Sequence, residues 1–108
     1  MKLVICMEIE DIRKVYADHG MKIVGHAERR MRERHIELYE IRDAILHGEI
    51  IEARYDEEPR PRYLILKAAK GCAPLHVILG VDWRTVDVIT AYRPNPQKWD
   101  STFRYRRD

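Results

Sequence analysis

The chain has 108 residues, of which 45% are hydrophobic and 35% charged, and its formal net charge is +2. These values are typical of one globular domain, and the apolar runs fall well short of the ~20 residues that a membrane span needs. Cys6 and Cys72 have no partner at metal-ligand spacing, so we expect reduced thiols, no metal site and no cofactor, while a single bridge between them stays open. The first residues lack the pattern of an export signal, which predicts a cytoplasmic protein.

Helices are predicted in the first half of the chain. Residues 1–6 are either a short strand or a disordered start. Apolar residues recur at helical spacing over residues 8–19, and Gly20 is placed to end this helix as a left-handed cap. Residues 21–25 form an extended link to a second helix that starts near His26. A third helix is expected at residues 37–47, with a glycine directly after it.

After Gly48 the hydrophobic period changes from helical to alternating, which predicts strands. Four are expected, at residues 49–54, 62–69, 75–82 and 86–92, and their short connections require antiparallel neighbours. The fold class is therefore α+β, with two or three helices packed on one face of a four-stranded antiparallel sheet. We expect a single domain over residues 1–108, with a core at about 8–99 and a basic tail at 100–108 that frays.

Residues 26–35, HAERRMRERH, form the stretch with the most ionisable side chains. On a helix, His26, Arg30 and Arg34 fall at i, i+4 and i+8 on one stripe, beside an apolar stripe that can face a core. The other charges of the run can pair with one another, as on an ordinary solvated helix face. His26, Arg30 and Arg34 have no carboxylate at the right spacing, which points to an anionic ligand.

Charge is distributed unevenly along the chain. Residues 26–35 hold four arginines and two glutamates, and residues 93–108 hold five basic and two acidic side chains. Residues 49–58 are the reverse, with five acidic side chains and one arginine. This pattern favours a basic surface opposite an acidic hairpin, and basic surfaces attract phosphates. Charges scattered for solubility would give similar counts.

The strand at residues 75–82 alternates between an apolar face, which is the natural core, and a face that carries His76. A three-residue turn after Asp82 would place Tyr92 directly opposite His76, whereas a two-residue turn would separate them. In the first register one face of the last strand carries Val86, Val88, Thr90 and Tyr92. His76, Thr90 and Tyr92 would then gather on the face away from the core.

Imidazole, phenol, hydroxyl and guanidinium groups together suit cleavage of RNA without a metal. A base takes the proton of the ribose 2′-hydroxyl, a cation stabilises the phosphate oxygens, and an acid protonates the leaving 5′-oxygen. His26 and His76 are candidates for base and acid in either order, because imidazole titrates near neutral pH. Each also has a purely structural explanation. His26 can simply begin a helix, and His76 can be a hydrogen-bonded, half-buried histidine.

Several motifs in order resemble the bacterial family called domain of unknown function 4258, over about residues 10–99: HAERRM, GEII, RPRYLIL, PLHV and ITAYRPNPQKW. That family is similar to the RelE/ParE-like toxins of type II toxin–antitoxin systems. The resemblance implies a RelE-like fold, metal-independent cleavage of RNA that is free or ribosome-bound, and an MqsA-like antitoxin as partner. Its motif falls on His26, Arg30, Glu33, Arg34, His76, Thr90, Tyr92 and Arg93. Glu37 stands where a Ser or Thr helix cap is expected, which should cost ~1 kcal/mol.

The leading hypothesis from the sequence is a toxin-like endoribonuclease that acts on RNA and not at a membrane. Its catalytic residues would be His26, His76, Tyr92 and Thr90, and its phosphate-binding residues Arg30, Arg34 and Arg93. The alternatives are a non-catalytic module that binds RNA or a protein partner, and an inactive scaffold. They are distinguished by whether His26 and His76 face a common pocket, because one phosphodiester must reach both imidazoles.

Overall fold

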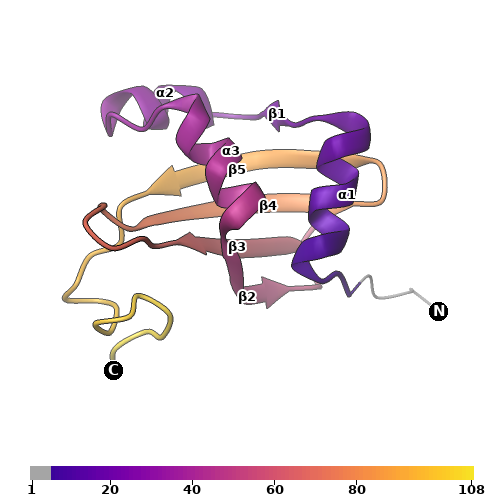
Figure 1. Cartoon of the computed structure of the whole chain (residues 1–108). Helices are drawn as coiled ribbons and strands as arrows, with labels where there is room; N and C mark the ends of the chain where they lie inside the picture. The colour runs from indigo at the N-terminus through magenta and orange to yellow at the C-terminus, as the bar shows by residue number, and fades with distance from the viewer. Residues whose placement is uncertain (1–5) are drawn as a thin grey trace.

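The computed structural model describes residues 6–108 and contains three helices and five strands within that range (Figure 1). In chain order they are α1 (Ile9–His19), β1 (Lys22–Ile23), α2 (Ala27–Glu33), α3 (Leu38–His47), β2 (Glu49–Arg54), β3 (Arg62–Lys67), β4 (Leu75–Asp82) and β5 (Thr85–Tyr92). The expected α+β class is confirmed. The expectation for the first residues falls almost entirely on residues 1–5, outside the described range.

The sheet has five strands in the order β1-β5-β4-β3-β2, so the prediction of four antiparallel strands was incomplete. The link at residues 21–25 contains β1, which runs parallel to β5 and pairs Lys22 with Asp87. The other neighbouring strands are antiparallel, and the sheet is therefore mixed. A strand of two residues is too short to show a period, so its partner rather than its own sequence defines it.

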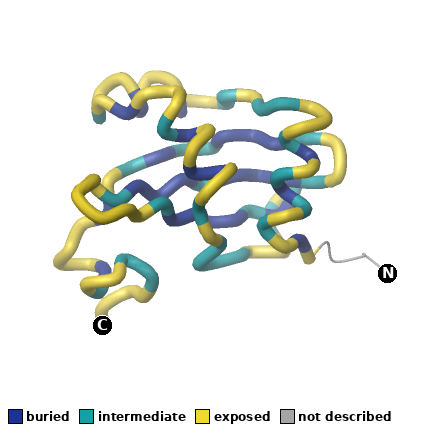
Figure 2. Tube along the Cα trace, viewed as in Figure 1, coloured by how far each residue is buried: buried dark blue, intermediate teal, exposed yellow. Residues whose placement is uncertain are grey.

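Helices α1 and α3 lie across one face of the sheet, and the strands beneath them are largely buried (Figures 1 and 2). The predicted core face of β4 is confirmed, because Leu75, Val77, Leu79 and Val81 are all buried. Arg13 of α1 donates hydrogen bonds of 2.8 Å to the carbonyl oxygens of Ile45 and Gly48. These bonds satisfy orphan carbonyls at the end of α3 and fix the two helices to each other.

The helix ends are set by local hydrogen bonds. Glu37 is not the expected Ser or Thr, but it forms a capping box with Glu40, in which the Glu37 N–H donates to the Glu40 carboxylate at 2.9 Å. Helix α2 ends with His35 at φ 56°, and the N–H of Ile36 donates to the Met31 carbonyl at 2.8 Å. This is a Schellman ending. It directs the chain from α2 into α3 within a few residues.

A β-bulge in β5 decides which of its side chains share a face. The β4–β5 turn has two residues, because Asp82 pairs with Thr85, so the predicted three-residue turn was wrong. Ile89 is the extra residue of the bulge, and beyond it Tyr92 lies opposite His76 as predicted. The prediction that Val86, Val88, Thr90 and Tyr92 share one face was wrong. Val86 and Val88 belong to the core, whereas beyond the bulge Thr90 lies on the opposite face of the sheet, across from Ile78.

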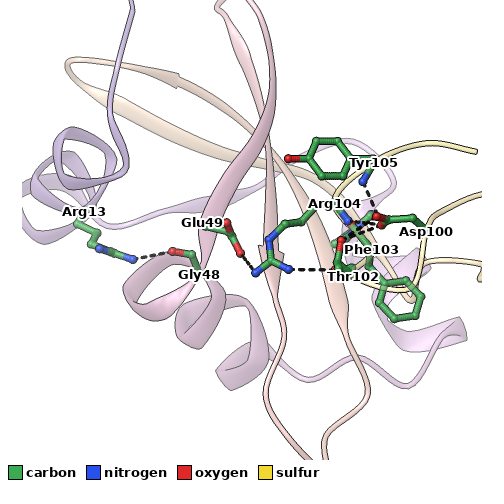
Figure 3. Close-up of polar contacts among 9 residues, drawn as sticks. Arg13, Gly48, Glu49, Asp100, Thr102, Phe103, Arg104 and Tyr105 are labelled. Atoms are coloured by element: carbon green, nitrogen blue, oxygen red, sulfur yellow. Dashed lines mark hydrogen bonds and ion pairs between the residues drawn. The ribbon is translucent and has the colours of Figure 1, made fainter.

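The tail, defined here as residues 94–108, folds back onto the sheet instead of fraying. Trp99 is buried, and Arg104 pairs with Glu49 (Figure 3). Arg106 pairs with Glu52 at 2.9 Å. Strand pairing puts both glutamates opposite Leu64 and Leu66, on the sheet face away from the helices. The basic tail and the acidic strand β2 are therefore in contact rather than on opposite surfaces.

Candidate nucleic-acid interface

Most of the predicted site residues line one open pocket between α2 and β5, with a volume of about 560 Å³. Five of the seven candidates line it, namely His26, Arg30, Arg34, Thr90 and Tyr92. Arg62 also lines it, and sequence reasoning missed this residue. The alternation of β3 could have revealed Arg62, because Tyr63 points into the core and its neighbour must point the other way. We call this cavity the cationic pocket.

The apolar stripe of α2 orients the cationic stripe. Ala27 and Met31 are buried against the body of the protein, so the positions on the adjoining stripe face the pocket. At the end of α2, Nη1 of Arg34 donates to the carbonyl oxygen of Ala91 at 2.7 Å and to the Thr90 hydroxyl at 3.3 Å. Ala91 and Thr90 therefore hold Arg34 in place, and Arg34 connects the end of α2 to β5.

The arginines of this pocket form no ion pair with any described residue. Within residues 6–108, neither Arg30 nor Arg62 forms an ion pair, and Arg34 bonds only to neutral oxygens. The neighbouring Arg29 differs, because it pairs with Glu33 at 2.9 Å. That hydrogen bond, with the charges of Arg29, Arg30 and Arg34, lowers the pKa of the Glu33 carboxyl. The electrostatic potential at this surface therefore favours the binding of a negatively charged ligand.

His76 is fully buried and does not line the cationic pocket. Its Nε2 lies 2.9 Å from the Phe103 carbonyl oxygen and its Nδ1 lies 3.3 Å from the Tyr92 hydroxyl. A carbonyl can only accept, so Nε2 carries the hydrogen and Nδ1 accepts from Tyr92. Burial lowers the pKa of His76, although the bond to Phe103 acts in the opposite direction. The neutral imidazole is therefore the favoured form.

The predicted pair of catalytic histidines is therefore not assembled. His26 is exposed at the start of α2, whereas His76 lies beneath the tail, with the Trp99 ring 4.5 Å away in an edge-on contact. One phosphodiester cannot reach both imidazoles while the tail is in this position. Tyr92 connects the two regions, because it lines the cationic pocket and also bonds to His76. His76 therefore contacts a wall of the pocket through this phenol, whose pKa burial raises.

Arg93 also lies outside the cationic pocket. Its Nη2 is 2.6 Å from the Glu40 carboxylate, in the first turn of α3. Burial alone would raise the pKa of Glu40, but bonds from Arg93 and the Glu37 N–H outweigh this effect and lower it. This geometry gives Arg93 a structural contact between the end of β5 and α3.

Residues 23–93 match the protein family described as "Domain of unknown function (DUF4258)". The chain belongs to this family. The match covers all nine residues that line the cationic pocket and ends before the tail that covers His76. No curated protein and no solved structure matches the chain.

Two further features bear on the class of site. In the part of the chain from Cys6 onward, no group of three His, Cys, Asp or Glu side chains is arranged to hold a metal ion. Across the same residues no helix is both long enough and apolar enough to cross a membrane. The chemistry available at the pocket of these described residues is that of guanidinium, imidazole, phenol and hydroxyl groups.

Proposed function

We propose that this domain binds RNA by its phosphate groups at the cationic pocket. The observation that carries the proposal is that Arg30 and Arg62 line an open pocket without any ion pair inside residues 6–108. Guanidinium groups bind phosphate through pairs of parallel N–H donors, and such contacts supply most of the affinity for a nucleic-acid backbone.

Arg34 supports this proposal by its geometry. Only its Nη1 is engaged among the described residues, by Ala91 and Thr90, so its other nitrogens remain available as donors. A guanidinium already fixed by two bonds loses little freedom when it binds an oxyanion, which favours affinity. The exposed imidazole of His26 at the same pocket adds a further hydrogen-bond donor or acceptor.

A single strand of RNA is the form that suits this pocket. Sequence-specific binding to RNA mostly uses unpaired segments, whose phosphates and bases can both be contacted on an open surface. The cationic pocket lies on the sheet beside a short helix, and α2 has only seven residues to enter a groove of duplex DNA. The resemblance of the sequence motifs to RelE/ParE-like toxins implies the same class of ligand.

Cleavage of the bound RNA, as in a toxin of a type II system controlled by an antitoxin, is the second candidate function. It is favoured by His26 and Tyr92 lining the same cavity. His26 would act as base or acid, a guanidinium would stabilise the phosphate oxygens, and the phenol would orient or protonate the substrate. In this version His76 is a positioning residue that orients the phenol of Tyr92.

The test of binding compares Arg30→Ala with Arg29→Ala on an unstructured, labelled RNA. Arg30→Ala should weaken binding about tenfold near physiological salt and reduce the slope of log affinity against log salt by ~0.7. Arg29→Ala is the matched control, because Arg29 lies on the same helix but is already paired with Glu33, so it should change affinity less than Arg30→Ala. An affinity that does not depend on salt concentration, or an equal loss of affinity in both variants, would overturn the proposal.

The same RNA, analysed on a denaturing gel, distinguishes the two functions. Intact RNA after incubation with protein that binds it favours the binding module. Products that disappear in His26→Ala, while affinity is retained, would select the ribonuclease. Products that persist in His26→Ala would exclude His26 as base or acid.

A further inference from the structure

A second pocket continues the open face of the sheet beyond the cationic pocket, with a volume of about 170 Å³. Arg62 lines both cavities. Strand pairing also connects them in one row across the sheet, because Thr90 lies opposite Ile78, Ile78 opposite Leu64, and Leu64 opposite Glu52. Adjacent strands are ~4.8 Å apart, so Thr90 and Leu64 are separated by about 10 Å, a span that one nucleotide can cover.

The walls of this second pocket combine an apolar surface with polar groups. Leu64 and Ile78 are neighbours on the sheet face away from the helices and present aliphatic side chains to the cavity. Glu52 is occupied by two bonds from Arg106, of 2.9 and 3.1 Å. Arg54 and Glu57 also line the cavity, and among the described residues neither forms an ion pair.

A carboxylate and a guanidinium at one apolar cavity match the edges of guanine. Guanine has two adjacent acceptors, O6 and N7, which a guanidinium binds with two parallel bonds. Its N1–H and N2–H groups are adjacent donors, which a carboxylate accepts in the same way. Adenine presents a donor beside N7 and no hydrogen on N1, and neither pyrimidine offers both pairs. Guanine alone complements both polar groups.

We propose that this second pocket is a guanine-binding subsite, in which Arg54 binds O6 and N7, Glu57 binds N1–H and N2–H, and the base lies on Leu64 and Ile78. The proposal rests on the proposed RNA binding, because the phosphate of the same nucleotide lies in the cationic pocket. Arg62, shared by both cavities, contacts the nucleotide between its phosphate and its base. The domain thus selects guanosine within a single strand.

The experiment compares the affinity of the full chain for short oligouridine with that for the same RNA carrying one central guanosine. We expect the guanosine RNA to bind at least about tenfold more tightly, which corresponds to one good paired contact to a base edge. Inosine lacks the N2 amino group and 7-deazaguanosine lacks N7, so each substitution should remove part of this preference. Adenosine at the same position should give no gain.

Variants assign the two polar groups. Glu57→Gln should abolish the preference for guanosine over inosine, and Arg54→Ala, which removes the donors to O6 and N7, should abolish the preference for guanosine over 7-deazaguanosine. Asp56→Asn is the matched control, because Asp56 is an exposed carboxylate of the same loop that does not line the pocket, and it should leave both preferences intact. Circular dichroism verifies that each variant is folded.

The outcomes separate this proposal from the proposed function. Equal affinity for oligouridine and the guanosine RNA, each sensitive to salt and to Arg30→Ala, would overturn the guanine subsite and leave phosphate binding in place. A preference for guanosine that survives Glu57→Gln and Arg54→Ala would also overturn it. If neither RNA binds, the proposed function fails and the subsite fails with it.

Discussion

His26 lines the same pocket as Tyr92 and His76 bonds to the Tyr92 hydroxyl, yet the surroundings of the two histidines differ. The region around His26 is open and holds guanidinium groups without ion pairs inside the described range, whereas His76 has no exposed surface and uses both ring nitrogens. The tail that covers His76 carries arginines with counter-charges, since Arg104 pairs with Glu49 and Arg106 with Glu52. One part of the sheet face has the properties of a binding surface, and the other those of an interior.

The difference arises from the tail, which covers one part of this sheet face and leaves the other part accessible to a ligand. Cross-strand pairing brings His76, Thr90 and Tyr92 to the same face, as the residues alone suggested. The Phe103 carbonyl and the Trp99 ring then cover one of the three. The family match spans residues 23–93 and therefore includes the face but not its cover. The tail contacts β2 through Glu49 and Glu52 and β4 through His76, and none of its residues lines the cationic pocket.

The largest expected effect comes from removing the buried imidazole. His76→Ala should lower the free energy of unfolding by about 3 kcal/mol, because it leaves a cavity and two polar groups, on Tyr92 and Phe103, without their partner. His26→Ala is the matched control and should change stability by less than about 0.5 kcal/mol, because His26 is exposed. Urea denaturation measures both. Similar small losses in the two variants would mean that the tail does not depend on His76.

The sequence predicted the parts of the fold that repeat a local pattern. The core face of β4 and the shared face of His26, Arg30 and Arg34 follow from simple periods. The structure has both, although His26 and Arg34 are the cap residues of α2 and not part of the helix. The parallel strand β1 and the bulge at Ile89 follow from the partners of these segments and leave no periodic signal in the chain. Two errors compensated, because the shorter turn and the bulge together restore the predicted pairing of His76 with Tyr92.

The candidate site was predicted less well, because the contacts that bury or pair its residues come from segments far away in the sequence. His76 is buried because the segment that contains the Phe103 carbonyl packs over it, and no rule of spacing connects a strand residue to a loop so far along the chain. Arg93 follows Tyr92 directly, but its partner is Glu40, more than fifty residues earlier. Spacing identifies which residues can share a face. Whether a face stays open depends on what packs over it.

A smaller effect should appear in the dependence of stability on pH. Burial holds the pKa of His76 below its ordinary value of 6.5, whereas in the unfolded chain His76 takes up a proton as the pH falls through 6.5. The unfolded state then binds more protons, so the free energy of unfolding falls with decreasing pH below about 6.5 and stops falling below the pKa of the folded state. Urea denaturation between about pH 7.5 and about pH 5.5 should show this decline.

His76→Gln provides the control for this titration. Glutamine keeps one donor for the Phe103 carbonyl and one acceptor for the Tyr92 hydroxyl, but it does not titrate. The variant should be less stable than the natural chain near neutral pH, and the difference should narrow as the pH falls. A variant whose stability declines as steeply as that of the natural chain would show that the pH dependence has another origin.

The smallest effect concerns the ion pairs that hold the tail. Glu52→Gln should lower the free energy of unfolding by about 0.5–1 kcal/mol, because both groups of the Glu52–Arg106 pair are partly solvated and Arg106 also stacks 4.6 Å from the Trp99 ring. Glu57 lines the same cavity but forms no ion pair with a described residue, so Glu57→Gln should lower the free energy of unfolding less than Glu52→Gln does. High salt should shrink the loss in Glu52→Gln, since it screens the pair in the natural chain. A loss unchanged by salt would assign the effect to packing of the Arg106 side chain on Trp99 rather than to charge.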